Sequence, residues 1–311
     1  MPPADANPGT ISLLETFLYI EPHRMRLPRL FIIGLSALLL NGCIKQIAIS
    51  SLGDIMDDGF AVLNEEQDLD IADKSIASNL KLLESILKSD PTNKHYLLLA
   101  SEGYASYALG FVEDESPDRA KVLYLRGKEF GMSILRQNKE FRNVEVGDIQ
   151  SFRKGLESFS RDDVPAVFWT AIGWGSYVQW SLTDPAALAD LPKIEAMMQF
   201  VLSRDSTYFY GGAQFFLGTL YGSRAKILGG DPDRSKLYFE RCLKINDGKF
   251  LMSYVYYARS YAVQTQDKEL FERCLSTVDS TSLEILPKAR LSNAIAKKKA
   301  SLLRSKIDQY F

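Results

Sequence analysis

The strongest constraint on the fold is a helical spacing of apolar residues that continues from residue 70 almost to the end of the chain. Apolar side chains recur three and four residues apart, as on one face of a helix, and no run alternates strictly as a half-buried strand does. The pattern predicts an all-α fold. The expected helices cover residues 70–89, 93–113, 117–138, 163–182, 188–204, 211–228, 232–246, 250–266, 268–279 and 285–309.

The segments between these helices have the composition of helix stops and starts. A residue that ends one helix is followed by a capping side chain or by a proline suited to the first turn of the next helix. These signals occur at Asp90-Pro91-Thr92-Asn93, Ser116-Pro117-Asp118, Asp184-Pro185 and Gly229-Gly230-Asp231-Pro232-Asp233. Helices joined by such short turns are expected to stack as antiparallel hairpins.

An internal repeat makes the architecture more specific. Phe239-Glu240-Arg241-Cys242-Leu243 recurs as Phe271-Glu272-Arg273-Cys274-Leu275, 32 residues later. A period of about 34 residues is typical of tetratricopeptide repeats (TPRs). Trp169-x2-Ile172-Gly173 also fits the start of a TPR first helix. We therefore predict a TPR-like helical-hairpin solenoid, an α-α superhelix, over residues 70–311, with the last helix as a C-terminal capping helix.

The repeat also bears on the two cysteines of this region. Cys242 and Cys274 occupy equivalent positions in successive hairpins, so their helices should lie about 10 Å apart. A disulfide requires Cα atoms less than about 7 Å apart. Both residues are therefore expected to be buried free thiols that pack as small apolar side chains.

The N-terminal region has the plan of a lipoprotein signal. From Met25 a short basic segment precedes an uncharged run of 14 residues, Leu30 to Cys43, which is too short for a comfortable membrane span. Its end, Leu40-Asn41-Gly42-Cys43, resembles a lipobox, with Asn41 as an imperfect match and the other three residues as expected. We expect residues 25–42 to be a signal peptide, lipidation at Cys43, and a tether and first helix over 43–69. Residues 1–24 resemble no targeting signal and are interpreted as an upstream extension.

Composition and motifs predict a protein that is not an enzyme and has no cofactor or metal site. His95 is the only histidine beyond the signal segment, and no Walker A loop, G-x-S-x-G turn or H-E-x-x-H motif is present. Lys and Arg number 37 against 39 Asp and Glu, which gives a net charge of -2. Without a cationic surface, no nucleic-acid partner is expected.

Two long uncharged segments are the most unusual feature of the chain. Residues 164–183 and 206–223 carry no charge and are rich in aromatic side chains. The first segment also contains glycine, serine and glutamine, which make it a poor candidate for a membrane span. Both segments can be the packed inner layer of the solenoid, or they can line a groove or pore for an apolar ligand. The candidate lining residues are Trp169, Trp174, Tyr177, Trp180, Tyr104, Tyr107, Phe111, Phe215 and Phe216.

The ordered set of these segments resembles the T-component (TatT) family of tripartite ATP-independent periplasmic (TRAP) transporters. The likeness rests on Leu80-Lys81-Leu82-Leu83-Glu84 through Asp90-Pro91, on Tyr104-Ala105-Ser106-Tyr107-Ala108-Leu109-Gly110-Phe111-Val112-Glu113, on Phe168-Trp169-Thr170-Ala171 to Trp174-Gly175, and on Gly229-Gly230-Asp231-Pro232 with Phe239-Glu240-Arg241, Gln266-Asp267 and Asn293-Ala294-Ile295-Ala296-Lys297. Together these segments span nearly all of residues 70–311.

The resemblance implies a lipid-anchored protein that faces the periplasm, in the envelope of a Gram-negative-type bacterium. It implies TPR-like hairpins, a homotrimer, a TRAP solute-binding protein as partner, and hydrophobic ligands as suspected substrates. The family supplies no catalytic residues. A general TPR adapter lipoprotein in envelope or outer-membrane assembly is the alternative, because it would have the same fold.

Overall fold

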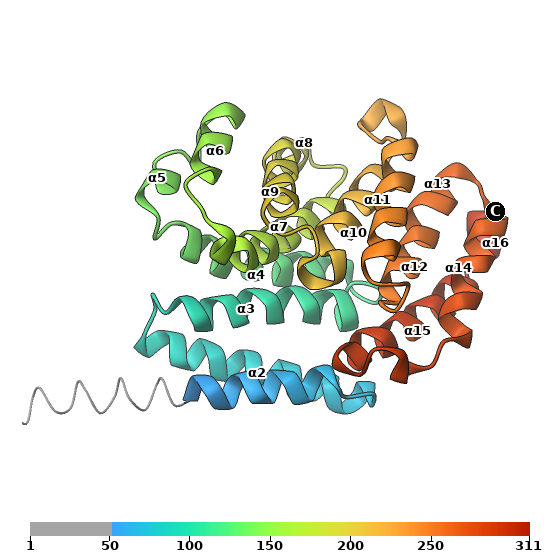
Figure 1. Ribbon diagram of the computed structural model, residues 1–311, viewed down its shortest axis with the longest axis horizontal. Coiled ribbons are helices and arrows are strands. Elements are labelled where there is room, and N and C mark those ends of the chain that lie inside the picture. The colour runs from blue at the N-terminus through green and yellow to red at the C-terminus, as the bar shows by residue number, and fades with distance from the viewer. Residues whose placement is uncertain (1–51) are drawn as a thin grey trace, which may run out of the picture. The chain divides into compact units, whose positions relative to one another are not determined.

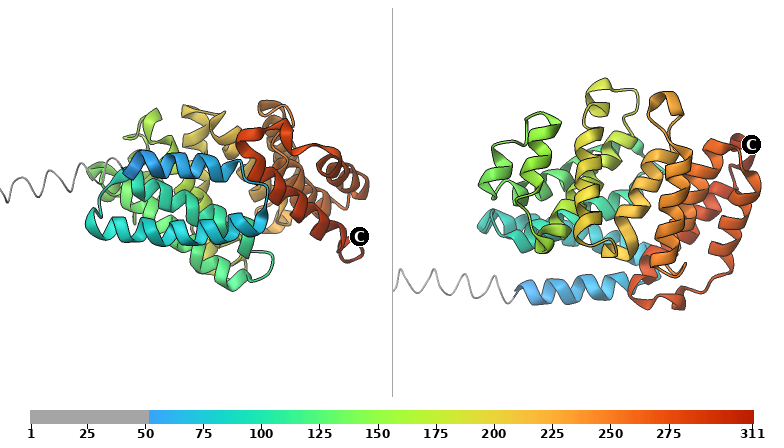
Figure 2. Two further views of the ribbon diagram at one scale, coloured as in Figure 1. Left: turned by 90° about the horizontal axis from the view of Figure 1, so that it is seen from below. Right: turned by 45° about the horizontal axis from the view of Figure 1, so that its top comes forward.

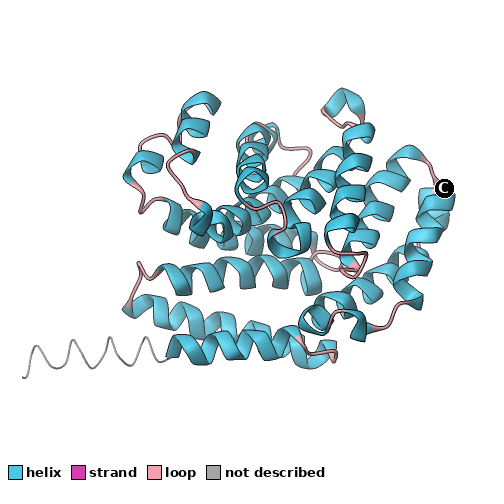
Figure 3. Ribbon diagram, viewed as in Figure 1, coloured by secondary structure: helices cyan, strands magenta, loops and turns pink. Residues whose placement is uncertain are grey.

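In the computed structural model, which describes residues 52–311, every regular element is a helix (Figure 1, Figure 3). The expected signal segment 25–42, the preceding residues and Cys43 lie outside the described residues. The all-α solenoid is confirmed. None of the helices within 52–311 is long and apolar enough to cross a membrane.

The chain forms a series of main helices joined by short turns. A helix over residues 52–64 comes first. The main helices that follow are α2 (Leu69–Ser89), α3 (Lys94–Tyr107), α4 (Pro117–Leu135), α7 (Val164–Gln179), α9 (Leu191–Arg204), α10 (Tyr208–Gly222), α11 (Pro232–Ile245), α12 (Met252–Tyr256), α14 (Lys268–Ser280) and α15 (Arg290–Arg304).

Short helical segments complete the chain. They are α5 (Lys139–Arg142), α6 (Ile149–Leu156), α8 (Pro185–Leu188), α13 (Val263–Thr265), α16 (Ile307–Tyr310) and the 3-10 turns η2 (Arg161–Asp163), η3 (Lys226–Leu228), η5 (Leu283–Ile285) and η6 (Pro287–Ala289). Two π-helical turns, η1 (Ala108–Val112) and η4 (Tyr257–Ala262), continue α3 and α12.

Three of the four predicted turn signals supply a side-chain helix cap, and the fourth, at Ser116, supplies only the proline of the first turn. The Asn93 side chain accepts from the backbone N–H groups of His95 and Tyr96 at the start of α3. Asp231 likewise caps α11, whose first residue is Pro232. Each cap satisfies a backbone donor that the first helical turn leaves without a partner, so the sequence fixes where these helices begin.

The helices form an inner and an outer layer. Helices α3, α7, α10 and α12 contact one another in that order, and α2, α4, α9, α11 and α14 pack behind them. Both uncharged segments thus belong to the inner layer, as α7 and α10. The repeated residues Phe239, Cys242, Phe271 and Cys274 are all buried, and the two cysteines are free thiols, as predicted.

The last long helix returns to the first part of the solenoid. Figures 1 and 2 show α15 beside α2 and the helix over 52–64. The Arg290 side chain donates to the backbone oxygen of Glu65 at 2.8 Å. The described unit therefore curves back on itself, and this curvature places α3, α7, α10, α12 and α15 around a common interior.

Residues 140–162, whose sequence pattern is weak, form α5, α6 and η2 with a small core of their own. Phe141 and Phe152 are fully buried, with ring centroids 5.3 Å apart. The Arg136 guanidinium binds both oxygens of the Glu145 carboxylate, at 2.6 and 2.7 Å. This segment extends α4 and packs on α9.

Candidate apolar ligand site

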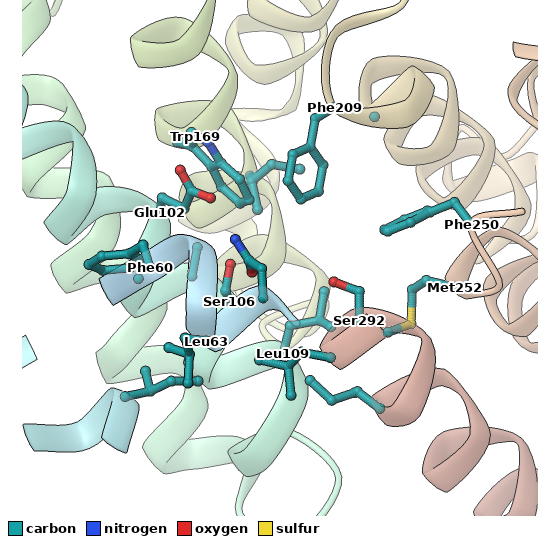
Figure 4. Close-up of a pocket in the computed structure, with 18 of the residues that line it drawn as sticks. Phe60, Leu63, Glu102, Ser106, Leu109, Trp169, Phe209, Phe250, Met252 and Ser292 are labelled. Carbon is teal, nitrogen blue, oxygen red and sulfur yellow. The ribbon is translucent and has the colours of Figure 1, made fainter. Parts of the chain in front are cut away.

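A cavity of about 110 Å³ lies where the inner helices converge (Figure 4). Helix 52–64 contributes Phe60 to its wall, α3 contributes Glu102 and Ser106, α10 contributes Phe209, and α15 contributes Ser292. Further lining residues are Leu63, Leu109, Phe111, Trp169, Ile172, Phe215, Phe250, Met252, Leu291 and Ile295. An apolar wall with a few polar groups is the usual character of a small-molecule site.

A second cavity, of about 370 Å³, adjoins the first. Leu109, Ile172 and Phe215 line both, so these three side chains form a shared wall between the two spaces. The second cavity is more polar, because Gln179, Arg259 and other hydrogen-bonding groups are part of its wall. Together the two cavities follow the inner face of α7 and α10.

The wall of the first cavity includes a strained backbone segment. Phe209 and Tyr210 have φ angles of 48° and 59°, and Gly211 follows with φ 81°. The left-handed region is costly for aromatic residues and is tolerated where the surroundings impose it, often at ligand sites. Here it places the Phe209 ring against Trp169, 4.8 Å between centroids, and against Phe250, 5.9 Å. Regular right-handed helix begins only after this segment.

One ionisable side chain, Glu102 on α3, lies among the described residues that line the first cavity. Burial raises the pKa of its carboxyl group to about 7. Burial also comes first among the causes that raise the pKa of Tyr208, and the charge of Glu102 adds to it. At neutral pH the Glu102 carboxyl is therefore divided between its acid and carboxylate forms, inside an otherwise apolar wall.

The second cavity contains Glu113, whose carboxylate has many partners. It accepts hydrogen bonds from the hydroxyls of Tyr124 and Tyr256, each at 2.6 Å, and from the Trp180 indole N–H at 3.1 Å. The Lys299 ammonium lies 2.8 Å away. Burial alone would raise the pKa of Glu113, but the nearby cations Lys299 and Arg259, with these donors, lower it to about 2.

The two π-helical turns bring the parts of this network together. Glu113 directly follows η1, Arg259 lies within η4, and their side chains approach to 3.3 Å. A π turn shifts the following residues around the helix axis relative to an α-helix, and such turns often occur at functional sites. Leu109, which lines both cavities, also lies within η1.

Five of the aromatic residues singled out from the sequence face these cavities. The first cavity is lined by Trp169 and Phe111, the second by Trp180 and Phe216, and Phe215 lies between them. Both long uncharged segments contribute, so their apolar character is used for packing and for cavity lining at the same time.

The other four predicted lining residues lie away from both cavities. Trp174 packs between α7 and its outer neighbours, where its N–H donates to Asp190 at 2.9 Å. Tyr104 is buried and its hydroxyl donates to Glu84. Tyr107 is buried beside Arg119, and Tyr177 is half-buried at the end of α7.

Several lining residues were not predicted. Glu102 lies four and seven residues before Ser106 and Leu109, which is the spacing of one helix face, and all three line the first cavity. This spacing can be read from the sequence and indicates that the three residues share one helix face. Phe60 and Phe250 carry no such signal, because they reach the cavity only through the return of distant helices.

Within residues 52–311, no group of three or more histidine, cysteine or acidic side chains is arranged to hold a metal ion. The site is thus built of apolar walls, one unpartnered carboxyl group and one fully hydrogen-bonded carboxylate.

Comparison with known proteins identifies the family of the chain. No curated protein matches the chain significantly. The family model of the TRAP transporter T-component matches residues 65–311, most of the chain and all the main helices except the one over 52–64. The protein therefore belongs to the TRAP transporter T-component family.

Proposed function

We propose that this protein is a lipid-anchored, periplasm-facing accessory of a TRAP transporter, which docks the solute-binding protein and holds an apolar ligand in its two adjoining cavities. Membership of the family supports a transporter component of the bacterial envelope. The lipobox at Cys43 supports the lipid anchor, because two or more acyl chains give stable membrane attachment.

The observation that carries the ligand part of the proposal is the shared wall of the two cavities. Leu109, Ile172 and Phe215 separate two spaces that run through the inner layer of the solenoid. Packed protein interiors have few voids larger than a water molecule. A dry cavity of about 150 Å³ binds benzene, so the first cavity is of the right order for one aromatic ring or a short alkyl chain.

The ligand part can be tested with bromobenzene, whose heavy atom quenches tryptophan emission on contact. Trp169 lines the first cavity and Trp174 lines neither. We expect saturable quenching in the chain from residue 44 onward, retained in Trp174→Phe and strongly reduced in Trp169→Phe. Quenching that does not saturate, or that both variants reduce equally, would count against a ligand in the cavity.

The accessory part can be tested by light scattering of the same chain with and without the solute-binding protein of its operon. A complex of increased mass, formed from trimers of this chain, is the expected result. A monomer whose mass the solute-binding protein leaves unchanged would contradict the transporter role. It would instead favour a general adapter in envelope assembly.

A further inference from the structure

The structure gives the Glu102 side chain no partner among the residues that it describes. Among residues 52–311 it makes no hydrogen bond and no ion pair, whereas Glu113, one cavity away, has five donors. Figure 4 shows the Glu102 carboxyl directed into the first cavity, near Trp169. Glu102 is half-buried, with its carboxyl group among apolar side chains, where polar groups of proteins usually have a hydrogen-bond partner, so the lack of one calls for an explanation.

The wall around Glu102 offers no positive charge. Among the described residues that line the first cavity there is no lysine, arginine or histidine, and the other polar side chains are Asn64, Ser106 and Ser292. The cavity is therefore apolar, with one acidic acceptor and no counter-charge. A ligand that complements it has an apolar body and one positively charged, hydrogen-bond-donating group.

We propose that the first cavity binds a small apolar amine, with the Glu102 carboxylate as the acceptor and counter-ion of its ammonium group. This inference rests on the proposed ligand-binding function and specifies the class of ligand. An ammonium group would give Glu102 the charge-assisted hydrogen bond that the protein does not provide. The aromatic rings of Trp169 and Phe209 would contact the apolar body, and their faces also attract a cation.

Other classes of ligand complement the cavity less well. An ionised carboxylate would place a second negative charge beside Glu102, with no cation in the wall to offset it. A pure hydrocarbon or halogenated ring can fill the apolar part of the cavity, but it gives Glu102 no hydrogen bond. An alcohol donates a neutral hydrogen bond, which is weaker than a bond between two charged groups.

Three six-carbon compounds that differ in their polar end test the proposal: hexylamine, 1-hexanol and hexanoate. Their binding to the chain from residue 44 onward is measured by titration calorimetry at pH 8 and moderate salt, where most Glu102 is ionised and hexylamine is protonated. We expect hexylamine to bind at least about tenfold more tightly than 1-hexanol, because a charge-assisted hydrogen bond replaces a neutral one. Hexanoate should bind weakest.

Two variants assign this preference to Glu102. Glu102→Gln keeps the size of the side chain and removes its charge, so hexylamine should lose its advantage while 1-hexanol still binds. Glu140→Gln removes a charge from an exposed position on α5 and should leave all three affinities unchanged. It controls for attraction of the amine to the net negative charge of the protein.

A second test, at pH 7, uses calorimetry to measure the number of protons released when the amine binds. Amine binding should release protons from the partly protonated Glu102 carboxyl, and Glu102→Gln should abolish this release. The inference is overturned if 1-hexanol binds as tightly as hexylamine or if Glu102→Gln retains the preference for the amine. If none of the three compounds binds, the proposed ligand-binding function fails together with the inference.

Discussion

At the scale of single residues, one buried carboxylate connects four separate helical segments. Glu113 accepts hydrogen bonds from Tyr124 on α4, Trp180 at the end of α7 and Tyr256 on α12, and it pairs with Lys299 on α15. Only about 3% of Glu113 is exposed. Its charge is thus compensated entirely by partners that are distant in the sequence.

Removing this carboxylate should destabilise the protein strongly. In Glu113→Ala, the Tyr124 and Tyr256 hydroxyls lose their acceptor and Lys299 keeps only Asp114 as a counter-charge. Breaking a buried charge pair costs about 3–5 kcal/mol of unfolding free energy. Urea unfolding measures the change. The control is Glu115→Ala, which removes an exposed ion pair with Lys298 and should cost less than about 1 kcal/mol.

The same group predicts how stability depends on pH. The folded-state pKa of Glu113 is about 2, below its ordinary value of 4.5, because the opposing charges of Lys299 and Arg259 outweigh the effect of burial. The unfolded state therefore binds the proton more readily, and the stabilisation present above pH 4.5 is lost progressively as the pH falls toward 2. Unfolding free energies of wild type and Glu113→Gln should converge over this window. A constant difference between them would contradict the assignment.

The role of a residue could be predicted from the sequence only where a local pattern, such as the internal repeat, indicates it. The burial of Cys242 and Cys274 followed from their equivalent positions in the repeat. The roles of Glu102 and Glu113 did not, because a glutamate in a helix has the same local pattern whether it faces solvent or an interior. What distinguishes these two is the set of partners that tertiary packing brings to each.

At the scale of elements, the contact between α4 and α7 depends on a glycine. A Cβ atom on Gly173 would lie 2.8 Å from the backbone nitrogen of Lys128 and 2.9 Å from the backbone oxygen of Tyr124. These atoms are part of the α4 backbone and cannot move aside alone. The close approach of the two helices is therefore possible only without a side chain at this position.

Alanine at two helical glycines should have opposite effects. Gly173→Ala must push α7 away from α4, and we expect a loss of about 1–3 kcal/mol from overpacking. Gly59, in the helix over 52–64, has nothing within 4 Å of an added Cβ. Gly59→Ala should therefore stabilise the protein by about 0.5–1 kcal/mol, through helix propensity alone. Thermal unfolding of both variants checks the prediction; stabilisation by Gly173→Ala would show that the helices are less closely packed.

The existence and order of the main helices were predictable, because amphipathic spacing and turn chemistry are local. Some boundaries were not. Helix α10 ends at Gly222, before the predicted end, and the chain passes through the 3-10 turn η3 to Gly229, with φ 81°. The π-helical turns η1 and η4 were also not predicted, since the same residues would fit an α-helix and the register shift is stabilised by tertiary contacts.

At the scale of the whole described unit, α15 closes the interior. Its buried Asn293 accepts from the backbone N–H of Leu251 at 2.9 Å and donates to the backbone oxygen of Lys249 at 3.0 Å. The Lys299 ammonium reaches the Glu113 carboxylate. The last long helix thus satisfies buried polar groups at the start of α12 and at the end of η1, in addition to its apolar contacts.

Deleting residues 290–311 should therefore abolish cooperative unfolding. The truncated chain would expose the first cavity and leave the Glu113 network without Lys299. Its helices would then no longer unfold together in one cooperative transition. For the chain from residue 44 onward, helix content by circular dichroism and tryptophan emission should follow one denaturation curve. In the truncated chain the two curves should separate. A single sharp transition after truncation would show that α15 is dispensable.

The solenoid could be inferred from the repeat, since each hairpin leaves an apolar face for its neighbour to cover. The return of α15 to α2 could not, because curvature is the sum of small rotations between successive helices. The cavity depends on that return: Phe60, Phe209 and Ile295 meet only once the unit is closed. The prediction from sequence therefore identified the inner helices but not the complete site.

The central claim is that the inner helices enclose a site for an apolar ligand. A crystal of the chain from residue 44 onward, soaked with bromobenzene and measured at the bromine absorption edge, tests it directly. We predict an anomalous bromine peak inside the first cavity, against the rings of Trp169 and Phe209. Bromine found only on the outer surface, or no peak at a concentration that saturates the quenching of Trp169, would contradict the claim.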